Sequence, residues 1–184
     1  MSNVYHPELK IAFIHVPKCA GTSISRALMD HGFVSAEDNQ WYDASYQQLA
    51  RRVPNIQDYK LVATVRNPVD WCISGYKMCN YWNLTFEEHL KTCINPVWHN
   101  RPGYKDWYWH CAILPHVHIT SNTNVFKVEQ MDKLKSWFEE QLNTVLDIPW
   151  VNQKSDTVTV TDSELSLIEK FTNEYAKKYK YKIR

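Results

Sequence analysis

Three things are scarce in this sequence: excess charge of either sign, long apolar runs and paired cysteines. The 21 Lys and Arg residues nearly balance the 20 Asp and Glu residues, so no overall charge attracts the chain to nucleic acid. No apolar run is long enough to cross a bilayer, and residues 1–10 lack the apolar core of a signal peptide. We therefore expect a soluble, cytoplasmic protein with no nucleic-acid or membrane partner.

The cysteines show none of the spacing that marks a redox or metal motif. There are five, an odd number, and no C-x-x-C occurs, which favours thiols in a reducing compartment and leaves a disulfide open. The pair His110-Cys111 and the nearby His116 and His118 carry ligand atoms for zinc, but a zinc site needs ligands that converge. No group of acidic residues suits a divalent ion either, so we expect no metal.

What is present fits one globular domain that spans residues 1–184. Apolar residues make up 44% of the chain and charged residues 22%, which is ordinary for a folded domain. Short apolar runs alternate with amphipathic stretches, which predicts an α/β fold. Strands are expected at residues 11–14, 60–65 and 124–128, with a short one near 33–34, and helices at 22–31, 44–52, after 68, and at 85–93, 104–114, 132–146 and 161–178.

Capping residues mark several of the expected helix ends. Gly32 suits the residue that follows a helix, where a left-handed conformation is common. Asn67 is a good N-cap for the helix that begins after it. Thr85 and Glu88 have the spacing of a capping box, and Thr161 or the residue after it is expected to cap the last helix.

The stretch from the first strand into the first helix carries the clearest chemistry. Residues 15–23, His-Val-Pro-Lys-Cys-Ala-Gly-Thr-Ser, predict a tight loop followed by the first turn of a helix. Gly21 lets a ligand approach the backbone closely, and His15 is expected to pack beneath the loop. The loop N–H groups and the positive end of the helix attract an anion, to which Lys18 adds a full charge. The stretch therefore predicts a phosphate or sulfate site.

This loop differs from the common nucleotide-binding loop, in which the lysine follows the second glycine as G-x-x-x-x-G-K-[ST]. Here Lys18 precedes Gly21, and no glycine opens the loop. Residues 15–23 instead resemble the 5′-phosphosulfate-binding loop of sulfotransferases that use 3′-phosphoadenosine 5′-phosphosulfate (PAPS). They are most similar to the branch that contains the carbohydrate 2-O-sulfotransferases. The resemblance implies a P-loop-like, three-layer α/β/α fold with a small central parallel sheet.

A second element follows the strand at 60–65. Arg66, Asn67, Pro68 and Ser74 resemble the family's 3′-phosphate-binding element, in which an Arg at a strand end and a Ser two helical turns later grip the phosphate. Guanidinium offers a planar, charge-assisted fork, and the hydroxyl adds a donor. Taken alone, the Arg-Asn-Pro pattern describes a capped helix after a strand equally well. Trp71 departs from the family, because many relatives carry a second Arg at that position.

The resemblance implies that PAPS is the donor and that no metal takes part. Lys18 and the loop would hold the 5′-phosphosulfate, while Arg66 and Ser74 would read the 3′-phosphate, which ATP lacks. Lys154 lies in a late loop and either adds a charge to the site or is a solvated lysine. The residues implied for donor binding are Lys18, Cys19, Ala20, Gly21, Thr22, Ser23, Arg66, Ser74 and Lys154.

The general base is open between two kinds of residue. In the related carbohydrate enzymes a His often precedes the helix before the second strand, and Asp43 occupies the matching position here. A carboxylate can serve if burial raises its pKa, but Asp43 is equally suited to be the N-cap of a helix that begins at Ala44. His110 is the histidine candidate, with His116 as its alternative, and both flank an apolar run where a hydrogen-bonded core role is common.

The acceptor is indicated only by composition. There are eight Trp residues, and aromatic faces both stack on sugars and fill cores. The sequence therefore predicts a PAPS-dependent sulfotransferase whose acceptor is a saccharide or small molecule, with the oligomeric state open. Two alternatives remain: a kinase-like phosphotransferase, and a non-catalytic nucleotide- or glycan-binding module that lacks the base.

Overall fold

The computed structural model describes residues 3–36, 45–79, 83–94, 113–149 and 158–183. The chain forms two compact units, of which the first comprises Met1–Val65 with Pro115–Lys154 and the second comprises Arg66–Leu114 with Ser155–Arg184. The first unit contains a sheet with helices, and the second contains helices. The single domain expected from the chain length stays a prediction.

The sheet of the first unit confirms an α/β fold with a parallel centre. Its described strands are arranged in the order β3-β1-β2-β4-β5. The central strand β4 (Lys60–Val65) pairs in parallel with β2 (Ile11–Ile14) on one side and with β5 (Asn124–Lys127) on the other. These are the three strands that the apolar runs predict, and β2 is buried at every position.

Two antiparallel strands extend the sheet beyond β2, which makes it mixed. Strand β1 (Val4–His6) pairs with β2 and with β3 (Val34–Ser35), both antiparallel. Sequence patterns did not indicate β1, because three residues are too few to show a period of two. It forms because the chain reverses just before β2, where Lys10 adopts the left-handed conformation with φ 53°, and this brings His6 opposite Ile11.

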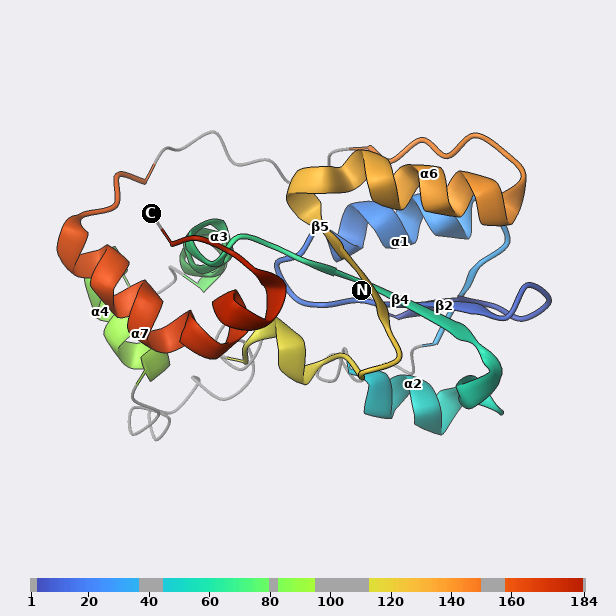
Figure 1. The fold of residues 1–184 in the computed structure, drawn as a ribbon, viewed down its shortest axis with the longest axis horizontal. Coiled ribbons are helices and arrows are strands. Elements are labelled where there is room, and N and C mark those ends of the chain that lie inside the picture. The colour runs from blue at the N-terminus through green and yellow to red at the C-terminus, as the bar shows by residue number, and fades with distance from the viewer. Residues whose placement is uncertain (1–2, 37–44, 80–82, 95–112, 150–157, 184) are drawn as a thin grey trace. The chain divides into compact units, whose positions relative to one another are not determined.

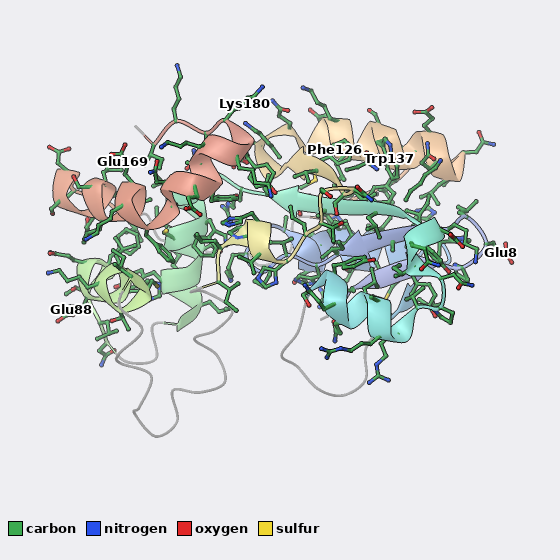
Figure 2. All side chains as sticks on the ribbon, turned by 60° about the horizontal axis from the view of Figure 1, so that its bottom comes forward. Glu8, Glu88, Phe126, Trp137, Glu169 and Lys180 are labelled. Carbon is green, nitrogen blue, oxygen red and sulfur yellow. The ribbon has the colours of Figure 1, made fainter. Side chains whose placement is uncertain are left out.

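Helices cover both faces of the sheet in this unit (Figure 1). Helices α1 (Gly21–Met29) and α6 (Met131–Leu142) lie on one face, and α2 (Tyr46–Arg52) lies on the other. Between the sheet and the first pair is an apolar core made of Val4, Ile11, Phe13, Ile24, Ala27, Leu28, Phe33, Val62, Leu134, Phe138 and Leu146. Phe126 on β5 and Trp137 on α6 lie beside each other at its margin, with ring centroids 6.1 Å apart (Figure 2). The three-layer arrangement is therefore present within the first unit.

Left-handed residues end the two helices that cover this core. After α1, Gly32 adopts φ 84°, and the N–H of Phe33 donates to the carbonyl of Leu28 at 3.3 Å, so the glycine ends the helix as predicted. The expectation that the helix at 132 continues to Leu146 is wrong. Asn143 adopts φ 50° and ends α6 at Leu142, and this turn returns the side chain of Leu146 to the core.

The second unit is built from α3 (Pro68–Cys79), α4 (Phe86–Ile94) and α7 (Asp162–Tyr179). The three N-caps predicted for the helices of this unit are confirmed. The amide N–H of Val69 donates to the Asn67 side chain at 2.9 Å, and capping boxes join Thr85 to Glu88 and Thr161 to Glu164. The backbone hydrogen bond from Thr85 also lowers the pKa of Glu88. In the first unit, short 3₁₀ helices complete the described elements at Ile56–Asp58, Pro115–Val117 and Val128–Gln130.

Aromatic side chains hold the helices of the second unit together. Trp71 of α3 is buried and packs on Phe171 of α7, with ring centroids 6.1 Å apart. Tyr76 of α3 contacts Phe86 and His89 of α4, at 5.2 and 5.6 Å between centroids. None of the described helices has the length and apolarity that crossing a membrane requires.

Burial of His89 makes the stability of this unit depend on pH. The side chain is 3% exposed, with Nε2 3.6 Å from Sγ of Cys93, and burial lowers its pKa from 6.5 to about 4. Between these two values the unfolded chain binds a proton that the folded chain excludes, so stability falls as the pH drops from 6.5 to 4. We expect a loss of up to roughly 3 kcal/mol, at 1.36 kcal/mol per pKa unit.

Urea unfolding at several pH values measures this effect. In His89→Gln the free energy of unfolding should fall less steeply over the same range, because the titrating group is gone. An unchanged slope in the variant would assign the acid sensitivity to other groups.

Candidate functional site

The loop after β2 places Lys18 in a conformation that lysine rarely adopts. The N–H of Cys19 donates to the carbonyl of Val16 at 3.3 Å, which closes a turn with Pro17 and Lys18 at its centre. Proline suits the first central position, and the second requires positive φ and usually takes Gly or Asn. Lys18 nevertheless occupies it with φ 64°, and its side chain is half-buried. Such left-handed residues persist where the surrounding structure holds them, and they concentrate at functional sites.

Helix α1 begins at this loop with an open N-terminus. Its N-cap residue Ala20 is also left-handed, with φ 63°, and has no side chain that can cap the helix. Within the described part of the chain, the N–H groups of Gly21 and Thr22 have no hydrogen-bond partner. Unpaired N–H groups and the helix dipole make this end of a nine-residue helix attractive to an anion. This geometry is compatible with the predicted anion site, and Lys18 lies in the same loop.

Strand β4 supports the loop through a residue that sequence reasoning missed. Thr64 is fully buried, and its hydroxyl donates a short hydrogen bond to the carbonyl of Cys19. A polar side chain within an otherwise apolar buried strand must find a partner, and that was the signal in the sequence. Cys19 is itself buried, so the side chain of this predicted donor-binding residue faces the core and only its main chain is offered to a ligand.

Asn3 ties the start of the loop to the start of α2. It is fully buried, and its side-chain oxygen accepts from the N–H of His15 at 2.8 Å. Its amide nitrogen donates to the carbonyl of Ser45 at 3.1 Å and to the side chain of Gln48 at 2.9 Å. No local pattern indicates this role, because the partners lie 12, 42 and 45 residues away.

The glycine of the loop is required by packing. A Cβ atom on Gly21 would lie 2.4 Å from Cδ2 of His15, well inside contact distance. His15 is buried beneath the loop, as predicted. The space that a side chain at residue 21 would need is therefore filled by the imidazole, which is a physical reason for glycine that the sequence did not reveal.

Gly21→Ala should therefore destabilise the fold by about 1–3 kcal/mol, the usual cost of overpacking a buried site. In a His15→Ala background the same change should cost less, because the imidazole is no longer in the way. Urea unfolding of the double-mutant cycle measures the difference. Gly32→Ala is the matched control, since its strain comes from φ 84° and from Nε2 of His6 at 3.1 Å, neither of which should depend on His15. An equal cost of Gly21→Ala in both backgrounds would contradict the steric explanation.

The second predicted element follows the end of β4. Arg66 is half-buried, and its guanidinium makes no hydrogen bond or ion pair with any described residue. Its main chain, by contrast, is held on both sides by the hydroxyl of Tyr175. Ser74 lies half-buried in α3. A positioned main chain with a cationic side chain that has no partner among the described residues is suited to binding an anion.

Strand order places the two predicted elements after neighbouring strands. Ile14, the last residue of β2, pairs with Ala63 of β4, so the carboxyl ends of both strands lie at the same edge of the sheet. In open α/β sheets this edge is where ligands bind. Lys18 belongs to the first unit and Arg66 begins the second.

Three of the predicted site residues lie outside the described residues, namely Asp43, His110 and Lys154. The alternative role of Asp43 as an N-cap is nevertheless wrong. Helix α2 begins at Tyr46, and its N-cap is Ser45, whose hydroxyl accepts from the N–H of Gln48. The helix begins later than predicted because this side chain satisfies its first turn.

Of the two described histidines near the apolar run, His116 is half-buried and His118 is buried. The carbonyl of His118 accepts from the N–H of Tyr46 at 3.0 Å. Cys19, Cys72 and Cys93 are buried and form no disulfide with one another, and burial raises the pKa of the Cys72 thiol. Among the described residues, no three His, Cys, Asp or Glu side chains are grouped as a metal site would need.

Comparison with known proteins adds one finding. A family model described as "Sulfotransferase family" matches residues 3–180, which span both units and both predicted anion-binding elements. No curated protein and no solved structure gives a significant match.

Proposed function

The chain belongs to the sulfotransferase family, and on that premise we propose that it moves the sulfuryl group of PAPS to an acceptor hydroxyl. The observation that carries the proposal is the open N-terminus of α1 beside Lys18, where N–H groups, the helix dipole and a cation converge on one loop. Such a loop suits a phosphosulfate group. The branch that contains the carbohydrate 2-O-sulfotransferases remains the most similar on its loop residues.

Two elements divide the donor between them in this proposal. Lys18 and the main chain of residues 19–23 hold the 5′-phosphosulfate, as the available N–H groups of Gly21 and Thr22 support. Arg66, whose guanidinium has no partner in the described structure, and Ser74 read the 3′-phosphate. Lys154 contributes a further positive charge. Recognition of the 3′-phosphate would make the site select against ATP, which has no phosphate on its 3′ oxygen.

The reaction is an in-line displacement at sulfur. A bond forms from the acceptor oxygen to sulfur, the bond from sulfur to the 5′-phosphate oxygen breaks, and the hydroxyl proton passes to a base. The leaving product is 3′-phosphoadenosine 5′-phosphate (PAP). Lys18 and the N-terminus of α1 stabilise the charge that grows on the leaving phosphate oxygen, in the manner of an oxyanion hole.

We propose Asp43 as the base, with His110 as the alternative. The cap of α2 supports Asp43, because Ser45 fills the capping role that would otherwise occupy a carboxylate. If Asp43 is the base, Asp43→Asn should bind PAP normally and lose transfer. If His110 is the base, His110→Asn should do so instead. Transfer at the parent rate in both variants would exclude the pair.

The acceptor is proposed to be a saccharide or another small molecule with a hydroxyl. Aromatic residues that could stack on such a molecule must lie outside the core. Trp71 packs on Phe171, and Trp137 packs on Phe126 and Phe138, so both rings are used in packing. The other six tryptophans fall outside the described residues and stay candidates, namely Trp41, Trp82, Trp98, Trp107, Trp109 and Trp150.

Calorimetric titration tests the donor class directly. PAP should bind tightly, and ATP with Mg²⁺ should bind weakly, because it lacks the 3′-phosphate. Transfer of sulfate from PAPS to a panel of sugars and polyols then tests for turnover. Binding of ATP alone would exclude the sulfotransferase proposal in favour of a kinase-like enzyme. Binding of PAP with no turnover on any acceptor would favour a non-catalytic nucleotide-binding module.

A further inference from the structure

A tyrosine near the C-terminus holds the main chain of Arg66 by both of its polar groups. The N–H of Arg66 donates to the hydroxyl oxygen of Tyr175 at 2.9 Å, and the same hydroxyl donates a short hydrogen bond to the carbonyl of Arg66. The two residues are 109 positions apart in the chain and belong to the same compact unit. One hydroxyl thus satisfies the donor and the acceptor of a single residue.

The hydroxyl is held in place by a fully buried ring. Tyr175 is 0% exposed in α7, and its ring contacts those of Tyr179 and Tyr181 at centroid distances of 5.4 and 6.0 Å. Tyr181 folds back because Lys180, labelled in Figure 2, ends α7 in the left-handed conformation. The N–H of Tyr181 then donates to the carbonyl of Ala176 at 2.9 Å. Tyr175 cannot move its hydroxyl without disturbing these contacts.

These two hydrogen bonds between Tyr175 and Arg66, here called the clamp, act on a residue outside regular secondary structure. Arg66 follows the last strand residue of β4, Val65, and precedes α3, which begins at Pro68. Because Arg66 lies between these two elements, its N–H and carbonyl need partners outside them, and a peptide group without partners is costly. Two hydrogen bonds fix the peptide planes on both sides of Arg66 and so fix the direction in which its side chain leaves the backbone.

Helix α7 has a second anchor in this unit, one turn before Tyr175, and this one is on α3. Phe171 packs on the buried Trp71. This aromatic pair holds α7 against α3 independently of the hydroxyl. Removal of the hydroxyl alone should therefore leave the helix docked while it releases the main chain of Arg66.

We propose that Tyr175 is a positioning residue for Arg66, through which α7 sets the selectivity for a 3′-phosphorylated nucleotide. This inference rests on the proposed role of Arg66. An arginine fork binds phosphate well only when its direction is fixed beforehand. Tyr175 touches neither the nucleotide nor the reacting atoms in this scheme and acts through the main chain of Arg66.

The test is calorimetric binding of PAP and of adenosine 5′-phosphate to four proteins: the parent, Arg66→Ala, Tyr175→Phe and the double variant. Tyr175→Phe should weaken PAP roughly tenfold, the scale of one or two hydrogen bonds, and leave adenosine 5′-phosphate unchanged. In the Arg66→Ala background it should have no further effect on PAP. Thr172→Val is the matched control, because it removes another buried hydroxyl of α7, one that donates to the carbonyl of Ile168 at 2.7 Å. The control should keep the preference for PAP.

The outcomes separate the inference from the proposed function. A parent that binds both nucleotides equally would remove the proposed function. If the parent and Arg66→Ala behave as expected while Tyr175→Phe keeps the full preference for PAP, the inference is overturned. Equal weakening of both nucleotides by Tyr175→Phe also overturns it, because the hydroxyl would then act on the fold in general.

A measurement on the parent keeps the inference testable if Tyr175→Phe does not fold. Hydrogen exchange at the Arg66 amide, followed by NMR without nucleotide, should be slow, because the clamp exists before any ligand binds. Exchange at the rate of an unstructured peptide would overturn the inference.

Discussion

Lys18→Ala is expected to lower the rate of sulfuryl transfer by roughly 10²–10³-fold, the usual cost of losing one group that stabilises developing charge. The loss should fall mainly on the chemical step, because the N–H groups of α1 remain to bind the donor. Lys18→Arg should keep part of the rate, since it keeps the charge and changes its shape. Transfer assays with PAPS and a responsive acceptor measure both variants.

The left-handed conformation of Lys18 offers a control that separates function from folding. Lys18→Gly removes the same charge but suits φ 64° better than any side chain. Its stability should therefore stay within about 1 kcal/mol of the parent, although its transfer rate falls as far as that of the alanine variant. A glycine variant that transfers sulfate at the parent rate would remove Lys18 from the mechanism.

Arg66→Ala is expected to weaken PAP by roughly 10–100-fold, the scale of charge-assisted hydrogen bonds to a phosphate. Adenosine 5′-phosphate should bind almost as before, because it has no 3′-phosphate and so makes no such contact with Arg66. The substitution should leave the fold intact, since the hydrogen bonds to Tyr175 come from the main chain of residue 66. Calorimetry with both nucleotides measures the two losses.

Arg66→Lys is the matched control for geometry. It keeps the charge and loses the planar fork, so its affinity for PAP should lie between those of the parent and Arg66→Ala. Increasing salt should narrow the difference in PAP affinity between the parent and Arg66→Ala, because the interaction that this variant removes is between charges. Equal losses of both nucleotides in Arg66→Ala would show that Arg66 does not read the 3′-phosphate.

Local features were predictable from the sequence because their causes lie within a few residues. The parallel strands at 11–14 and 60–65 follow from short buried apolar runs. The capping boxes at Thr85 and Thr161 follow from a spacing of three residues. Strand β1 was missed because it is a three-residue strand that exists only through pairing, and α6 was predicted too long because Asn143 takes a conformation that its neighbours do not indicate.

The sequence by itself determined the family of this protein, and it also supplied the two elements proposed for its site: a lysine before a helix N-terminus and an arginine after the next parallel strand. Only the tertiary structure decided how these elements are held. Thr64 supports the carbonyl of Cys19, and Tyr175 clamps Arg66 from 109 residues away. The physical reason is range: caps and periodic patterns act within a few residues, whereas buried polar groups find partners wherever the fold brings them.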